Sequence, residues 1–82
     1  IALAREAGRR GDGVTCAMNA ANEVAVHAFL RGTISFPDIT AVAAGAILDW
    51  EPEEPRSFEA AEAVDAEARG RAAALCARAA AT

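Results

Sequence analysis

The sequence predicts an all-α fold, a small helical bundle of three helices plus the tail of a fourth. Alanine, the strongest helix former, occupies 24 of the 82 positions. Apolar residues recur at spacings of three and four between recognisable helix starts and stops, which is the periodicity of a helix with one buried face. No segment shows the alternation and β-branched enrichment of a strand. Because the chain is short, we expect one domain covering residues 1–82.

The first two predicted elements meet at a glycine-rich turn. Residues 1–7 read as the end of a helix, and a polar turn follows it to Gly13. A second helix begins between Thr15 and Asn19, because either side chain can accept a hydrogen bond from the first turn, and it runs to Arg31, where a glycine stops it. Its predicted core-facing residues are Met18, Ala21, Ala25, Val26, Phe29 and Leu30.

The third helix has the clearest start signal. Ser35 is its N-cap, Pro37 stands in the first turn where an amide is not needed, and Asp38 completes a capping box. The helix is predicted over residues 36–49. Gly45 inside it indicates that another backbone approaches closely there or that the helix is well buried. The apolar stripe, with the hydrophobic staple that precedes it, consists of Ile34, Ile39, Val42, Ala43, Ala46, Ile47 and Trp50.

A proline-containing loop, residues 51–56, follows the third helix. Each proline disfavours a helical conformation in the residue before it, so the segment cannot continue the helix. We expect the acidic residues 51–54 to be solvated, with a divalent-ion or partner contact as the alternative.

The last helix begins after Ser57, which caps it, and runs to about Ala79. Asp65 lies one turn before Arg69, which predicts an exposed ion pair. The apolar pattern of this helix consists of Phe58, Ala61, Val64, Ala68, Leu75 and Cys76.

Composition argues against several classes of function. A net charge of −4, with eight arginines and no lysine, leaves no basic face for nucleic acid or an anionic membrane. The most apolar run, residues 41–48, is far shorter than the ~20 residues that span a bilayer. The N-terminal residues lack the basic and cleavage segments of a signal peptide. We therefore expect a cytoplasmic protein that binds neither nucleic acid nor membrane.

Candidate catalytic and metal-ligating residues are few. Cys16 and Cys76 stand in no recognisable motif with a base, so we expect reduced thiols and no disulfide, nucleophile or metal site. Glu23 and His27 lie one turn apart, but zinc takes three or four ligands, which favours an ordinary helical pair. The glycines of residues 11–13 lack the third glycine and the preceding strand of a dinucleotide-binding loop.

Three motifs stand in order in the second and third predicted helices. They are Asn-Ala-Ala-Asn-Glu at residues 19–23, Ala-Phe-Leu at residues 28–30 and Ile-x-Phe-x-Asp-Ile at residues 34–39. With these motifs the chain resembles the C-terminal domain of the 1-deoxy-D-xylulose 5-phosphate (DXP) reductoisomerases, over nearly all of its length. Further matching residues in the last helix are Ser57, Asp65, Ala68 and Arg69. The departures, Met18 for a common Leu and Thr15 for a frequent Pro, affect only the predicted start of the second helix.

This resemblance implies a part of an enzyme of non-mevalonate isoprenoid synthesis. Such an enzyme rearranges DXP and reduces it with NADPH to 2-C-methyl-D-erythritol 4-phosphate, uses Mg²⁺ or Mn²⁺, and is usually a homodimer. The catalytic, NADPH-binding and metal-binding residues of the family lie upstream, so none of them falls within residues 1–82. The resemblance therefore implies a C-terminal helical domain that packs on the catalytic domain of its own longer chain and itself binds no cofactor.

The cluster Asn19, Asn22 and Glu23 raises a separate question, because Asn is unfavourable inside a helix. Local capping is one explanation and accounts for Asn19. The other is that Asn22 or Glu23 reaches backbone or Arg groups of the upstream catalytic domain.

Two further roles for the whole chain stay open at this point. The first is a stand-alone helical interaction module without activity. The second is a metal-binding domain that uses His27 and the acidic loop.

Overall fold

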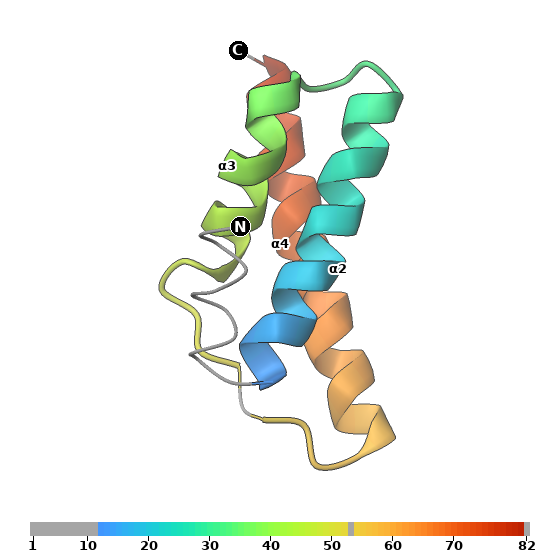
Figure 1. Cartoon of the computed structure of the whole chain (residues 1–82), viewed down its shortest axis with the longest axis vertical. Helices are drawn as coiled ribbons and strands as arrows, with labels where there is room; N and C mark the ends of the chain where they lie inside the picture. Colours follow the sequence, from blue (N-terminus) through green and yellow to red (C-terminus); the bar gives the residue numbers. More distant parts are fainter. Residues whose placement is uncertain (1–11, 53, 82) are drawn as a thin grey trace.

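The computed structural model describes residues 12–52 and 54–81, which form three helices: α2 (Asp12–Leu30), α3 (Phe36–Ile47) and α4 (Phe58–Ala81). In Figure 1, α2 and α4 run in the same direction and α3 runs in the opposite one. Each helix contacts the other two. The predicted all-α bundle is confirmed. The predicted helical tail over residues 1–7 lies outside the described residues.

The start of α2 differs from the prediction. The helix begins at Asp12, so Gly13 is helical and Asn19 lies two turns inside the helix. Two glycines in three residues favour a turn locally, but Val14 is only 2% exposed, and its burial against the bundle stabilises an additional helical turn. Asn19 is therefore not a cap, and local capping does not explain it.

The end of α2 follows the prediction to within one residue. Gly32 adopts a left-handed conformation with a φ of 76°. Its N–H donates to the carbonyl of Phe29 at 2.9 Å, and the N–H of Thr33 donates to the carbonyl of Ala28 at 2.9 Å. These two bonds form a Schellman motif, in which a glycine satisfies the last carbonyls of a helix.

The capping box of α3 is present as predicted. The carboxylate of Asp38 accepts hydrogen bonds from the backbone N–H of Ser35 at 3.0 Å and from its hydroxyl at 2.9 Å. The helix ends at Ile47, two residues earlier than expected, because Leu48 is extended and Asp49 takes a left-handed φ of 59°. The cap of α4 is also confirmed, since the Ser57 hydroxyl accepts from the N–H of Ala60 at 3.1 Å.

The capping box makes the stability of the chain depend on pH. Its backbone and hydroxyl hydrogen bonds from Ser35 lower the pKa of Asp38 below its ordinary value of 3.8. Because the pKa is lower in the folded state, this carboxylate stabilises the fold fully above that ordinary value and loses its effect as pH falls through the folded-state pKa. Asp38→Asn is expected to destabilise the chain at neutral pH and progressively less in acid. Urea denaturation at a series of pH values, with Glu62→Gln at an exposed position as control, checks this.

Alanine dominates the core. Nine of the 14 buried apolar residues are Ala, and Val14 is the largest fully buried side chain among the described residues. The first cluster consists of Ala21, Ala25, Ala28, Ile34, Val42, Ala46, Ala72 and Cys76. The second cluster consists of Val14, Ala17, Ala20, Ile47 and Ala68. Such small side chains leave a thin core, as the composition predicts.

Two residues assigned to the core by periodicity are exposed. Leu30 is 73% exposed and Phe58 is 78% exposed. The prediction was wrong because Ala fills the buried faces, so the larger apolar residues do not mark which stripe faces inward. Ile34 is buried in the first cluster and Ile39 packs against that cluster, at the two positions of the predicted staple.

Of the two explanations predicted for Gly45, a well-buried helix applies, because α3 buries Val42, Ala43, Ala46 and Ile47, whereas the close neighbour of Gly45 is a side chain and not a backbone. A Cβ at this position would lie 3.0 Å from Cδ1 of Leu75 on α4. Gly70, in contrast, is helical and exposed, and nothing lies within 4 Å of the equivalent point.

Gly70→Ala is expected to raise the free energy of unfolding by about 0.5–1 kcal/mol, because Ala is the better helix former and no neighbour is displaced. Gly45→Ala should stabilise less or destabilise, because Leu75 must move. Thermal unfolding of the two variants side by side tests the difference, and equal shifts would contradict it.

Candidate functional site

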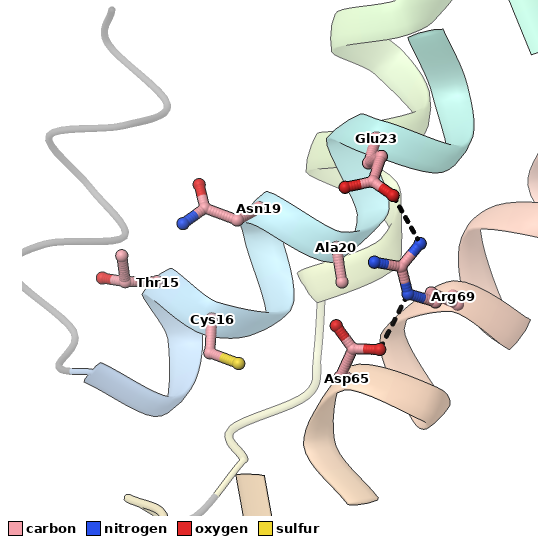
Figure 2. Close-up of a pocket in the computed structure, with 7 residues that line it drawn as sticks. All are labelled: Thr15, Cys16, Asn19, Ala20, Glu23, Asp65 and Arg69. Carbon is pink, nitrogen blue, oxygen red and sulfur yellow. Dashed lines mark hydrogen bonds and ion pairs between the residues drawn. The ribbon is translucent and has the colours of Figure 1, made fainter. Parts of the chain in front are cut away.

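An open groove of about 430 Å³ lies between α2 and α4. Figure 2 shows its lining: Thr15, Cys16, Asn19, Ala20 and Glu23 from α2, with Asp65 and Arg69 from α4. The α2 residues stand at positions i, i+1, i+4, i+5 and i+8, so they share one flank of the helix. The groove is lined by three of the five residues of the Asn-Ala-Ala-Asn-Glu motif, Asn19, Ala20 and Glu23, and by the predicted Asp65–Arg69 pair.

Arg69 links the two walls of the groove. Its Nε donates to Oδ2 of Asp65 at 2.7 Å, and its Nη1 donates to Oε1 of Glu23 at 3.2 Å (Figure 2). These hydrogen bonds raise the pKa of the Arg69 guanidinium, and the bond to Asp65 has the larger effect. The Asp65 pair was predicted from its one-turn spacing, whereas Glu23 is 46 residues from Arg69 in sequence and no local pattern could identify it.

The three charged side chains of the groove, Glu23, Asp65 and Arg69, form an ion-pair network that joins α2 to α4. We call this network the clamp. Both carboxylates are engaged by the same guanidinium, and the three side chains are 40–55% exposed. A general acid or base needs a titratable group positioned at a reacting atom, and none of these three is available in that way. The arrangement connects α2 to α4 through Arg69.

The clamp is expected to stabilise modestly, because exposed ion pairs contribute little. Arg69→Met and Glu23→Gln should each destabilise less than loss of a core side chain, and the double variant should lose less than the sum of the two. At about 1 M salt, where the Debye length is about 3 Å, the coupling should shrink. A double-mutant cycle by urea denaturation at low and high salt measures it, and additive effects at low salt would contradict the clamp.

The other candidate residues do not form a site. The Glu23 carboxylate is bound by Arg69, and His27, one turn later, is exposed. Within residues 12–52 and 54–81, no group of three His, Cys, Asp or Glu side chains could hold a metal ion. Glu51 and Glu54 are exposed, and the residue at position 53 lies outside the described part.

Both cysteines are free thiols, as predicted. Cys16 is half-buried at the groove, and Cys76 is buried in the first cluster. Burial raises the pKa of the Cys76 thiol, although nearby Arg31 opposes this shift. Cys76 therefore stays protonated and serves as a small core side chain.

A second cation contact lies away from the groove. The guanidinium of Arg71 stands 4.4 Å from the ring centroid of Trp50, and its Nε donates to Glu67 at 2.9 Å. This contact attaches the segment after α3 to α4, and no local sequence pattern indicates it. None of the helices in the described part has the length and apolarity needed to cross a membrane.

Comparison with known proteins gives one consistent result. A sequence model of the DXP reductoisomerase C-terminal domain matches residues 1–71. The DXP reductoisomerase of Nocardia farcinica is 51% identical over 77 residues, covering 92% of this chain and 20% of the relative. That of Thermus thermophilus is 50% identical over 72 residues, covering 88% of this chain and 19% of the relative. The chain spans about a fifth of the length of these relatives. No solved structure matches it.

Proposed function

Because the chain belongs to the DXP reductoisomerase C-terminal domain family, we propose that it is the helical C-terminal domain of a longer reductoisomerase. Its role is architectural: it packs on the catalytic domain of the same chain and stabilises it. The observation that carries this proposal is the match to only about a fifth of each relative, in a chain whose core is mostly Ala. A domain with so thin a core gains stability from a neighbour.

The reaction proposed for the full-length enzyme is the rearrangement of DXP and its reduction with NADPH to 2-C-methyl-D-erythritol 4-phosphate, with Mg²⁺ or Mn²⁺. The residues that bind NADPH and metal would lie outside residues 1–82. The described residues do not fit a divalent metal, because no three candidate ligands converge and the acids of the groove are paired with Arg69. We further propose a cytoplasmic homodimer for the full-length enzyme.

The domain assignment is tested by sequencing the gene upstream of the codon for Ile1. The proposal requires a nucleotide-binding domain and a catalytic domain in the same reading frame. An open reading frame without them would favour the stand-alone interaction module.

Activity measurements test the architectural role. The full-length enzyme should oxidise NADPH when given DXP and Mg²⁺, and deletion of residues 12–82 should lower its thermal stability and turnover together. The 82-residue chain alone should show no turnover, and its melting temperature should not change with NADPH, Mg²⁺, Mn²⁺ or Zn²⁺. Turnover, or stabilisation by one of these ligands, would overturn the assignment of an inert domain.

A further inference from the structure

The side of α2 opposite its buried residues carries a second stripe of side chains. The buried residues of the helix, among them Ala21 and Ala25, lie on one side. An α-helix turns by about 100° per residue, so residues spaced by three, four and four positions share one side. Four residues with this spacing lie on the side of α2 opposite the buried one. We call them the outer stripe: Asn19, Asn22, Val26 and Leu30.

The outer stripe is accessible in this chain. Asn19 and Asn22 are exposed. Asn19 also stands at the groove between α2 and α4, and Figure 2 shows its side chain projecting away from Arg69. Val26 is half-buried but belongs to neither core cluster, and Leu30 is 73% exposed. Among the described residues, the two Asn side chains make no hydrogen bond.

The outer stripe also lacks charge. Exposed positions of α4 carry the charged residues Glu59, Glu62, Glu67 and Arg78, as a face in contact with water usually does. The four residues of the outer stripe carry none. Asn is a poorer helix former than the Ala that fills so much of this sequence, so two exposed Asn residues weaken α2 unless they bind something. Depletion of charge around exposed apolar residues is typical of the centre of a protein interface.

We propose that the outer stripe is the surface through which this domain docks on the rest of its own reductoisomerase chain. The inference rests on the proposed function and specifies the contact. About four-fifths of each relative lies outside the matched region, so a chain of that length supplies the partner. Carboxamides both donate and accept, so Asn19 and Asn22 fit main-chain N–H and C=O groups of a loop or extended segment. Val26 and Leu30 fit an apolar side chain of that segment.

The structure also separates Glu23 from this role. Its carboxylate is bound by Arg69, which holds α2 on α4. Of the two residues that the sequence suggested for contact with the catalytic domain, Asn22 is therefore the one that faces a partner.

Photo-crosslinking in the full-length enzyme tests the docking surface. A photoreactive amino acid replaces Val26 in one variant and Phe58, 78% exposed at the start of α4, in the control. We expect the Val26 variant to crosslink within one chain, to a peptide outside residues 1–82, and the control not to. A crosslink from position 26 to the same domain of a second subunit, or none, would overturn the inference. A crosslink to the catalytic domain from position 58 alone would also overturn it while leaving the proposed function intact.

Thiol labelling provides an independent measurement. Asn22→Cys is compared with Ala66→Cys, an exposed position of α4, in the native full-length enzyme. Docking predicts labelling at position 22 several-fold slower than at position 66, with equal rates after denaturation. Equal rates in the native enzyme would contradict docking through the outer stripe. Both substitutions are at exposed helical positions, and circular dichroism of each variant verifies that the fold is retained.

Discussion

Ile47→Ala is expected to lower the free energy of unfolding of the chain by about 2–5 kcal/mol. Ile47 is 3% exposed and is the largest side chain of the second cluster, whose other buried members are Val14 and three alanines. The buried alanines around Ile47 have no side-chain torsion with which to fill a cavity, so the lost contacts are replaced only as far as the partly buried Met18, Trp50 and Val64 can move. Urea denaturation followed by circular dichroism measures the change.

The next residue provides the control. Leu48 is 66% exposed, so Leu48→Ala removes a side chain of similar size from the surface. Its effect should fall within about 0.5 kcal/mol of zero. Equal destabilisation by the two substitutions would show that the second cluster is not a packed core.

Ala25→Leu is expected to destabilise by about 1–3 kcal/mol, although Leu is a good helix former and is more apolar. Ala25 is 0% exposed in the first cluster, in which Ala46 and Ala72 are also almost completely buried. Three additional carbon atoms force the helices apart or the new side chain into a strained rotamer. A melting temperature below that of the unmodified chain is the expected result.

Ala44→Leu is the matched control for this substitution, because Ala44 is exposed on α3. The same change in volume should leave the melting temperature nearly unchanged. A stabilising effect of Ala25→Leu would mean that the first cluster contains unfilled space and is not closely packed.

The helix ends that carry a local capping motif were the most predictable part of the fold. Ser35 with Asp38 and Gly32 act within a few residues, so the sequence contains the whole interaction. The start of α2 was predicted too late because the burial of Val14, a tertiary effect, outweighs the low helix propensity of the neighbouring glycines.

The candidate site was predictable only where its contacts are local. The Asp65–Arg69 pair follows from one-turn spacing, but the Glu23–Arg69 and Arg71–Trp50 contacts join different elements and depend on the bundle. Leu30 was assigned to the core because periodicity identifies a stripe and not the direction it faces. In a chain where Ala fills the buried faces, large apolar residues do not identify the inner stripe.

The alanine core also affects how the helices are aligned along one another. A surface of methyl groups is smooth, so sliding one helix by a turn against its neighbour exchanges one Ala contact for another with little change in energy. Alignment then depends on the few features that fit in one position only, such as Ile47, the indole of Trp50 under Arg71 and the bridge from Arg69 to Glu23. These side chains select one longitudinal register among several that the alanines alone would accept.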